Sequence, residues 1–276
     1  MIRLIVNADD LGAGAATDRG ILHAFRRGMV GSASLLANGP SFAEAARAAL
    51  GEGVPIGAHL NLAEGVPLAG SIPGLTTASG EFPGKEVCRQ RLVTGRIAPG
   101  ALARELSAQL SRIVDAGLSP DHLDTHQHCA LFPAVTAALL QVAGEFGIPA
   151  LRLPAPAEPM ADDPGGELGQ ELLLYRSLAP PFDTAVRRAG LATPDGLWGM
   201  ALLDRLDEPA LEQLLLRLPT GTWELMVHPG YADPGRPFAT AARERELAAL
   251  TSPRLRGLLT ARQITLITFQ ELACAS

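Results

Sequence analysis

Histidine and aspartate gather in short segments that coincide with the ends of apolar, strand-like runs. Asp9 and Asp10 follow the first run, and His59 lies in a later one, where strand alternation places it on the same face as Asn61. Adjacent carboxylates repel each other, so an acidic pair at a strand end indicates either a turn or a nearby cation that keeps both groups ionised. For His59 the two interpretations are a hydrogen-bonded core residue and a metal ligand.

The segment with the most such residues is His122–His128, which carries histidine or aspartate at every second position. If one strand runs through it, four imidazole or carboxylate groups share a face, and two rings can point at one metal. Such ligands suit Zn, Mn, Fe, Co or Ni better than a site built for Mg or Ca alone. Asp124 can instead hold a ligand histidine by its second ring nitrogen. A polar edge strand with solvated histidines is the alternative.

His228 ends a late strand-like run, directly before a Pro-Gly turn. Alternation aims Glu224, Met226 and His228 to one side of that strand. An imidazole there can titrate near neutral pH and act as a general acid or base, whereas a helix or turn cap is the structural alternative. His23 falls in a helix-like segment, and we expect it to have no chemical role.

The elements that position these residues alternate between strands and helices. The predicted strands are Arg3–Ala8, Ala33–Ala37, Ile56–Leu62, His122–His126, Ala150–Leu153, Trp223–His228 and Ile264–Thr268. The predicted helices are Ala16–Arg27, Ser41–Leu50, Ala101–Ala116, Pro133–Phe146, Glu208–Leu218 and Thr240–Leu250. This alternation favours an α/β fold with a parallel sheet, and about seven strands favour an irregular (β/α) barrel with its active site at the carboxyl ends of the strands. Two stretches rich in glycine and proline, 64–83 and 154–169, are predicted to be long loops.

Composition narrows the class of protein. The 276 residues suffice for one large domain, so we treat 1–276 as a single unit. A net charge of −6 argues against nucleic acid as a partner. No apolar stretch is long enough to span a membrane and none resembles a signal peptide before Asp9, so we expect a cytoplasmic protein without a membrane partner. The three cysteines lack CxxC spacing and indicate neither disulfides nor a thiolate metal site.

Five segments, taken together, resemble the YdjC-like carbohydrate deacetylases, the family that includes chitooligosaccharide deacetylase. They are NADDLG at 7–12, GAHLNL at 57–62, HLDTHQH at 122–128, LRLP at 151–154 and VHPGY at 227–231. Each is weak alone, but their order and spacing cover most of the chain. The resemblance implies a polysaccharide-deacetylase-like barrel and a hydrolase that removes an N-acetyl group from a sugar and releases acetate.

The resemblance also implies one divalent metal ion, with Mg or Zn foremost and Mn, Co or Ni as alternatives. Its ligands would be Asp10, His59 and His126. In the family the histidine cluster often continues to a position that is Ala130 here. This departure leaves open whether His126 or His128 is the second histidine ligand.

The same resemblance assigns the acid–base chemistry. Asp9 would be the general base and His228 the general acid, and Arg152 would orient Asp9 or the substrate. Two further residues, Asn61 and Asp124, would complete the surroundings of the metal and substrate. Aromatic residues make up only 4% of the chain, which favours a small N-acetylated sugar over a long polymer. A homodimer is the expected assembly for an enzyme of this size.

Other functions stay open on the sequence alone. A metal-dependent phosphoesterase or amidohydrolase also uses H-x-H at strand ends, commonly with two metal ions. A non-catalytic sugar-binding protein would keep the fold, although it would need neither Asp9 nor His228. A dinucleotide loop beginning at Gly12 is disfavoured, because Thr17 replaces its third glycine and no acidic residue stands at a strand end about 20 residues later.

Overall fold

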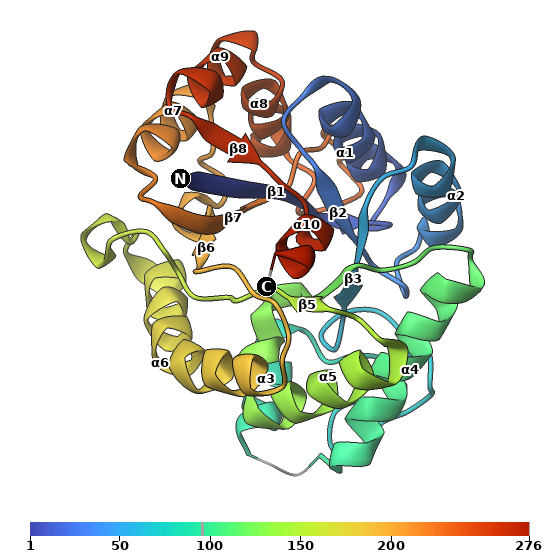
Figure 1. Cartoon of the computed structure of the whole chain (residues 1–276). Coiled ribbons are helices and arrows are strands. Elements are labelled where there is room, and N and C mark those ends of the chain that lie inside the picture. The colour runs from blue at the N-terminus through green and yellow to red at the C-terminus, as the bar shows by residue number, and fades with distance from the viewer. Residues whose placement is uncertain (95–96, 276) are drawn as a thin grey trace.

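Eight parallel strands form one sheet in residues 1–94 and 97–275, the part of the chain that the computed structural model describes. The strand order is β5-β4-β3-β2-β1-β7-β6, and β8 pairs with β1. The strands are β1 (Ile2–Leu11), β2 (Ser32–Leu35), β3 (Ile56–Leu60), β4 (His122–Thr125), β5 (Ala150–Leu151), β6 (Leu197–Trp198), β7 (Gly221–Val227) and β8 (Ile264–Leu266). Figure 1 shows the helices arranged around the outside of these strands, apart from α10 (Phe269–Cys274), which lies over the middle of the ring of strands.

Strand β1 is the centre of the sheet. It pairs with β7 from Ile2 to Ala8, with β8 near its start and with β2 near its end. The register with β2 shifts between Ala8 and Leu11, and Asp10 inside this bulge has a φ of 69°. Bulges re-aim side chains next to active sites, and this one lies at the acidic pair.

The two edge strands of the sheet meet and close it into a ring. Parallel bridges join Ala150 of β5 to Ala192, before β6, and Pro156, after β5, to Leu197 of β6, so the two edges lie side by side. The closure rests on these isolated bridges, whereas the other strands pair through continuous ladders. The predicted irregular (β/α) barrel is therefore confirmed.

Ten α-helices and three short 3₁₀ turns occupy the described residues. The α-helices are α1 (Ala15–Arg27), α2 (Phe42–Glu52), α3 (Lys85–Val93), α4 (Pro99–Asp115), α5 (Pro133–Phe146), α6 (Gly166–Arg188), α7 (Glu208–Arg217), α8 (Ala241–Leu250), α9 (Pro253–Ala261) and α10 (Phe269–Cys274). The 3₁₀ turns are η1 (His126–Leu131), η2 (Met160–Asp162) and η3 (Met200–Leu202). None of the helices within 1–94 and 97–275 is long and apolar enough to cross a membrane.

The two faces of the sheet differ in polarity, as β1 illustrates. Val6 and Ala8 point outward into the main apolar core under the helices. Asn7 points inward and hydrogen-bonds to Ser32 and Ser34 of the neighbouring strand. Helices therefore pack on an apolar surface, and the barrel interior is left for polar side chains.

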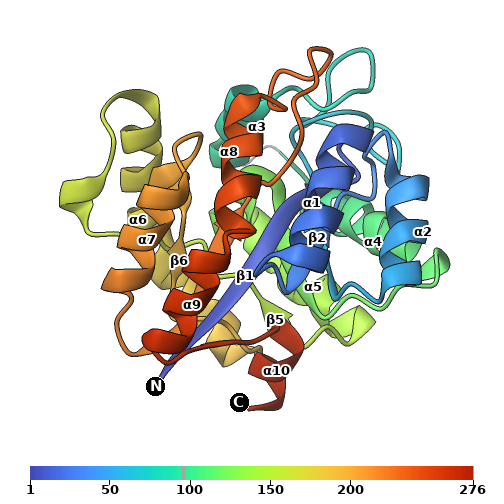
Figure 2. The same ribbon diagram turned by 90° about the horizontal axis from the view of Figure 1, so that it is seen from above.

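The amino end of the barrel is closed by the C-terminal helix α10. Figure 2 shows α10 beside the chain termini, at the end where β1 begins. Phe269 of α10 packs with Ile5, Ala150, Ala192 and Leu272 in a small separate apolar cluster. Helix α10 closes only the amino end, so the end at which the strands finish stays open.

Strand β4 is shorter than predicted, and this changes the expected site. The predicted strand His122–His126 ends at Thr125, and His126 begins the turn η1. Gln127 and His128 have φ angles of 57° and 56°, a left-handed backbone that cannot continue a strand. The prediction that four histidine and aspartate groups share one strand face is therefore wrong.

Other differences concern elements with weak sequence patterns. Strand β6 has only two residues and escaped prediction. Helix α6 begins at Gly166, inside the predicted loop 154–169, and its pattern is obscured by the internal Pro180 and Pro181. Helices α3, α9 and α10 were also not predicted. The predicted loop 64–83 contains no helix or strand, as expected.

Candidate active site

The carboxyl ends of the strands open into a cavity of about 610 Å³. Its base comes from the ends of β1, β3, β4 and β7, and its walls come from the loops that follow them and from α3 and α6. The predicted site residues that line it are Asp9, Asp10, His59, Asn61, His126, His128 and His228. Asp124 and Arg152 do not line the cavity and are each 1% exposed.

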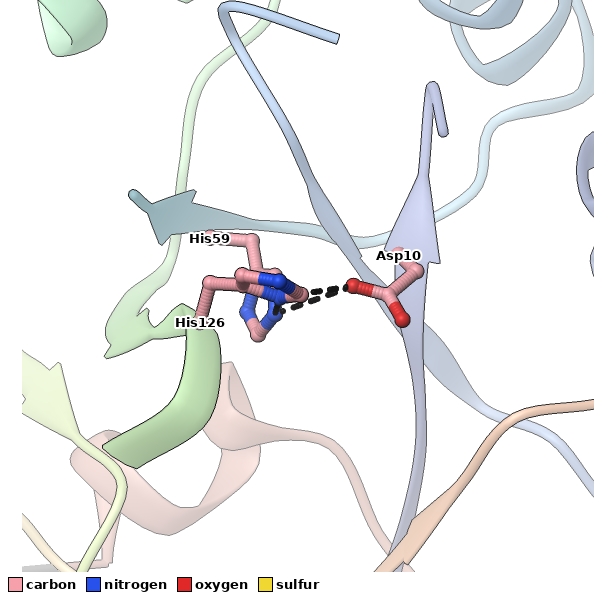
Figure 3. Close-up of side chains that lie close together, drawn as sticks. All are labelled: Asp10, His59 and His126. Atoms are coloured by element: carbon pink, nitrogen blue, oxygen red, sulfur yellow. Dashed lines mark hydrogen bonds and ion pairs between the residues drawn. The ribbon is translucent and has the colours of Figure 1, made fainter. Parts of the chain in front are cut away.

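Three side chains from distant parts of the chain converge at the base of this cavity, and we call Asp10, His59 and His126 the outer group (Figure 3). Asp10 Oδ1 lies 3.0 Å from His126 Nδ1 and 3.3 Å from His59 Nε2. The two ring nitrogens are 3.3 Å apart. Each potential ligand atom therefore faces both of the others.

These distances fit a shared cation. Ligands about 2.0–2.2 Å from a metal, separated by angles between a right angle and the tetrahedral angle, stand about 3.0–3.5 Å from one another. Asp10 Oδ1 is buried and has no hydrogen-bond partner, although the two rings flank it. A buried carboxylate oxygen without a hydrogen bond calls for an explanation, and a metal ion supplies one.

Local backbone geometry brings the outer group together. Asp10 projects from the β1 bulge, His59 from β3, and His126 from the residue directly after β4. The Ala130 N–H donates to Thr125 Oγ1 at 2.8 Å and holds the turn in which His126 lies. Parallel strands end at one edge of the sheet, so residues from three strand ends meet there.

The charges of the outer group are coupled. Burial alone would raise the pKa of Asp10, but His126 and His59 outweigh burial and hold that pKa well below its usual value. Burial alone would lower the pKa of His126, but Asp10 outweighs it and raises that pKa to about 9. Without a metal ion, protons on the rings supply the positive charge that the carboxylate requires.

A second set of charged side chains lies directly beneath, and we call Arg152, Asp9, Asp124 and Glu224 the inner group. The Arg152 guanidinium donates to both oxygens of Asp9 at 2.6 Å and to Glu224 at 2.8 Å, and it lies 2.8 Å from Asp124. All four residues are at most 2% exposed. Burial would lower the pKa of Arg152, but the surrounding carboxylates raise it well above its usual value.

Asp9, His59 and Asp124 are also close enough to be considered as metal ligands. Arg152 already contacts both carboxylates of that set, so a cation is present there. Asp124 Oδ1 accepts from His59 Nδ1 at 2.8 Å, which leaves His59 Nε2 facing Asp10. Asp124 therefore holds the second ring nitrogen of His59 and orients its ring. This was one of the two interpretations of Asp124 from the sequence.

His128 and Asn61 line the cavity without joining the outer group. The left-handed backbone turns His128 toward Tyr175, against which its ring packs edge-on with 5.3 Å between centroids. Asn61 accepts from the N–H groups of Ala63 and Glu64 and donates to Asn38, so its side chain holds the loop after β3.

His228 directly follows β7 and lines the cavity. Its backbone N–H donates to Glu246 Oε1 at 2.7 Å, and its ring packs edge-on against Phe238 with 5.2 Å between centroids. Burial lowers the pKa of His228 to about 4, so the ring is neutral at pH 7.

Sequence reasoning missed the residues of α8 that support this loop. Glu246 and Arg243 are 3% and 2% exposed and form an ion pair of 3.1 Å, and Arg243 lies over the Phe238 ring. A signal was present, because Arg243, Glu246 and Leu250 share one helical face. Charged residues in line with a buried leucine indicate a supporting role.

Known proteins resemble this chain in sequence over nearly its whole length. The family model described as YdjC-like protein matches residues 3–261. A carbohydrate deacetylase of Mus musculus is 33% identical over 98% of this chain and 95% of that protein. A carbohydrate deacetylase of Geobacillus stearothermophilus is 34% identical, over 97% and 96%. A chitooligosaccharide deacetylase of Serratia marcescens is 30% identical, covering 98% of each protein.

Solved structures agree on the architecture. A crystal structure from Enterococcus faecalis V583, described as a candidate cellobiose-phosphate cleavage protein, matches with a TM-score of 0.76 at 24% identity, covering 98% of each chain. A mutant of a CE4 family pseudoenzyme, described as having restored enzymatic activity, matches with a TM-score of 0.50 at 11% identity, over 98% of this chain and 67% of that one. The barrel fold is shared with these two structures, and the chain belongs to the YdjC-like family.

Proposed function

We propose that this protein is a divalent-metal-dependent hydrolase that removes the N-acetyl group from a small sugar or oligosaccharide and releases acetate. The observation that carries the proposal is the outer group, in which three ligand atoms face one another within 3.3 Å. Relatives named as carbohydrate deacetylases, at 30% identity or more over nearly the whole chain, support the substrate class.

Asp10, His59 and His126 are the proposed ligands of one ion. Two imidazole nitrogens and one carboxylate oxygen suit Zn²⁺, Co²⁺, Ni²⁺ or Mn²⁺, and Mg²⁺ remains an alternative. When bound, the ion would supply Lewis acidity, which acidifies water and offsets negative charge on the acetyl oxygen. His128 is proposed to contact substrate, since its ring is turned away from the ligand atoms.

Asp9 is the proposed general base. Its carboxylate lines the cavity next to Asp10, and Arg152 holds both of its oxygens at 2.6 Å. This double contact fixes the direction of the Asp9 carboxylate, so that it can accept a proton from a water molecule beside it. Asp124 plays a supporting part by orienting His59, and Asn61 by holding the wall of the cavity.

His228 is the proposed general acid, which gives a proton to the departing amine. Because its ring is neutral at rest, the proton that it passes to the amine comes from solvent, and it is taken up as negative charge develops on the substrate next to the ring. The proton that Asp9 accepts from water returns to solvent, so the step balances. The backbone contact with Glu246 fixes the start of the loop that carries the ring. An amine leaves readily only once it is protonated, so this step decides whether the amide bond breaks.

The cavity suits a small ligand. Its volume of about 610 Å³ is within the usual range of about 300–1,000 Å³ for small-molecule sites. Two aromatic residues line it, and only Phe238, at 43%, is well exposed, because Tyr175 is 2% exposed. We propose that residues 1–276 act as a single domain, since β8 near the C-terminus pairs with β1.

The inner group argues against a two-metal phosphoesterase or amidohydrolase. The position where a second ion would share His59 is filled by contacts to Arg152. A two-metal enzyme commonly holds its ions about 3.5–4 Å apart, between bridging ligands. The expected metal content is therefore one ion per chain.

Acetate release tests the function directly. We would incubate the protein with each of several divalent ions and a panel of N-acetylated mono- and oligosaccharides, and then measure acetate and free amine. The variant Asp9→Asn should bind sugar as well as the parent but release no acetate. No release from any sugar with any ion would leave a sugar-binding protein as the better conclusion. Two ions per chain by elemental analysis would favour the two-metal hydrolases.

A further inference from the structure

A buried carboxylate on α1 has no part in the proposed chemistry. Asp18 lies in the first turn of this helix, is 6% exposed and does not line the cavity. An acidic residue at this place usually stabilises the amino end of its own helix. Asp18 instead reaches back beyond the start of α1, where its Oδ1 accepts from the backbone N–H of Gly12 at 2.7 Å. Its contact is therefore with the loop that follows β1.

The second oxygen of Asp18 binds the loop that follows β2. Ser41, directly before α2, donates from its Oγ to Asp18 Oδ2 at 2.5 Å and from its backbone N–H to the Gly12 carbonyl at 3.1 Å. The two loops are packed tightly here, since a Cβ added at Gly39 would stand 2.3 Å from the Gly12 oxygen. Both polar groups of Gly12 are thus held, its N–H by Asp18 and its carbonyl by Ser41.

The peptide group between Leu11 and Gly12 is held on both of its sides. Its carbonyl, on Leu11, accepts from the Leu36 N–H at 2.8 Å, and its N–H, on Gly12, donates to Asp18. A backbone N–H can only donate, so the directions of these hydrogen bonds are fixed by their chemistry. With both atoms engaged, this peptide plane cannot rotate freely.

This peptide lies inside a turn that begins at Asp10. The Ala13 N–H donates to the Asp10 carbonyl at 3.0 Å and closes the turn. Asp10 itself has a φ of 69°, a left-handed conformation that is strained for a residue other than glycine and persists only where the surroundings impose it. In that conformation the Asp10 carboxylate faces His59 and His126. The contact with Asp18 is one of the constraints that impose it.

We propose that Asp18 is a positioning residue for the metal site, and that its carboxylate, by holding the Gly12 N–H, keeps Asp10 in the conformation that faces the two imidazoles. The inference rests on the metal site of the proposed function and extends it to α1. Without the acceptor at position 18, the turn from Asp10 to Ala13 can relax to an ordinary backbone conformation. The Asp10 carboxylate then turns away from the ring nitrogens, and one of the three ligands of the ion is held less firmly.

Three variants of the full chain test this proposal through metal affinity, measured by calorimetric titration with Co²⁺ and by the visible spectrum of bound Co²⁺. Asp18→Ala removes both acceptor oxygens. Asp18→Asn removes the negative charge, but its amide oxygen can accept from Gly12 and its amide nitrogen can donate to Ser41 Oγ. Ser41→Ala removes only the hydroxyl contact and leaves the Gly12 N–H bound.

Loss of a group that supports a metal ligand commonly weakens metal binding by about 10- to 100-fold. We expect Asp18→Ala to weaken Co²⁺ binding by at least about tenfold, Ser41→Ala by about threefold, and Asp18→Asn by less than about twofold. The Co²⁺ spectrum should shift in Asp18→Ala, because one ligand is displaced, and should be unchanged in Asp18→Asn. All titrations are done below the unfolding temperature of each variant, so that a loss of stability alone leaves the affinity unchanged.

The control is Asp207→Ala, which removes another carboxylate that accepts from a backbone N–H. Asp207 caps α7 by accepting from the Ala210 N–H at 2.9 Å, and it does not line the cavity. This variant should unfold at a lower temperature and bind Co²⁺ like the parent.

Parent-like Co²⁺ affinity in Asp18→Ala would overturn the positioning role. Equal losses of affinity in Asp18→Asn and Asp18→Ala would also overturn it, because the effect would then belong to the charge of Asp18 and not to its contacts. So would equal losses in Asp18→Ala and Asp207→Ala, which would assign the effect to stability. If Asp18→Ala does not fold, an unaltered affinity in Ser41→Ala overturns the proposal. No Co²⁺ binding by the parent would overturn the metal site and this proposal together, whereas the other outcomes leave the metal site standing.

Discussion

The inner and outer groups both hold buried carboxylates and lie in contact with each other through Asp124 and His59, but they differ in their source of positive charge. In the inner group Arg152 contacts Asp9, Asp124 and Glu224. In the outer group the described structure has only the imidazoles of His59 and His126 beside Asp10. A buried carboxylate needs a cation, so one group is complete within the chain and the other is proposed to take an ion from solution.

This difference divides the acidic pair Asp9-Asp10. The two residues are adjacent in the sequence and both line the cavity. At the β1 bulge, however, the Asp9 carboxylate contacts Arg152, whereas the Asp10 carboxylate faces the imidazoles of the outer group. The repulsion between neighbouring carboxylates is thus relieved in two different ways. His59 connects the groups, because one nitrogen contacts Asp124 and the other faces Asp10.

The largest expected effect is on the stability of the inner group. Arg152→Met would leave three buried carboxylates without their cation, which should lower the free energy of unfolding by about 3–5 kcal/mol or prevent folding. Chemical denaturation of the metal-free protein measures this. Arg217→Met is the control, because Arg217 pairs with Asp162 on the surface and should contribute less than about 1 kcal/mol. Equal losses in the two variants would contradict the assignment of Arg152 as the internal cation.

Asp10→Asn should change the ion affinity of the outer group and leave the folding of the metal-free chain intact. We expect it to weaken divalent-ion binding by more than about 100-fold, since loss of a ligand exceeds loss of a supporting residue. The metal-free chain should stay folded, as circular dichroism would show. Glu212→Gln is the control, because this carboxylate pairs with Arg254 and does not line the cavity. Unchanged ion affinity in Asp10→Asn would remove Asp10 from the ligand set.

His228→Gln separates chemistry from metal binding. Loss of a general acid commonly lowers the rate by about 100-fold or more, so acetate release should fall by at least that factor. Ion affinity should not change, because His228 is not in the outer group. A parallel loss of ion affinity would mean that His228 also contributes to ion binding and belongs to the outer group.

His228 should also make stability depend on pH. Its pKa is about 4 in the folded chain and near 6.5 when unfolded, so the unfolded state binds the proton more tightly. The stability that belongs to the neutral ring is fully present above about pH 6.5 and is lost as the pH falls toward 4, by about 3 kcal/mol. Comparing unfolding free energies of the parent and His228→Gln between pH 4 and 7 measures this. Parallel curves would show that the ring is not held neutral.

The smallest expected effect concerns the rim of the cavity. Phe238 is 43% exposed and is backed by Arg243 at 4.5 Å from its ring centroid. Phe238→Leu removes an aromatic face and keeps apolar bulk, so KM for an N-acetylated sugar should rise about threefold to fivefold, with kcat nearly unchanged. Phe25→Leu, on α1 and outside the cavity, is the control. A change in kcat alone would place Phe238 with His228 in the chemistry.

Much of the fold was readable from local patterns. Alternating strand and helix segments predicted the barrel, and the glycine- and proline-rich stretch 64–83 predicted a loop. Short elements such as β6 were not predicted, because two residues are too few to show an alternating hydrophobic pattern. Their pairing also depends on Pro156 and Glu224, which lie elsewhere in the chain. Helix α6 was hidden by Pro180 and Pro181, which tertiary packing accommodates inside a helix.

The candidate site shows the same division. Residue types and their places at strand ends predicted which side chains would meet, and the structure brings Asp10, His59 and His126 together. The roles of His126 and His128 could not be separated, because strand alternation treats them alike. The chain leaves the strand after Thr125, and His128 has a left-handed backbone within η1. As a result the His126 ring faces Asp10 and the His128 ring faces Tyr175.

The sequence by itself determined the chemical groups available and the strand ends that carry them, because apolar periodicity and residue type are local properties. Only the tertiary structure decided which carboxylate receives Arg152 and which faces the two imidazoles. That choice depends on a bulge, a chain turn and the guanidinium of Arg152, which directly follows β5. Burial makes each of these contacts strong, and burial exists only once the barrel has closed.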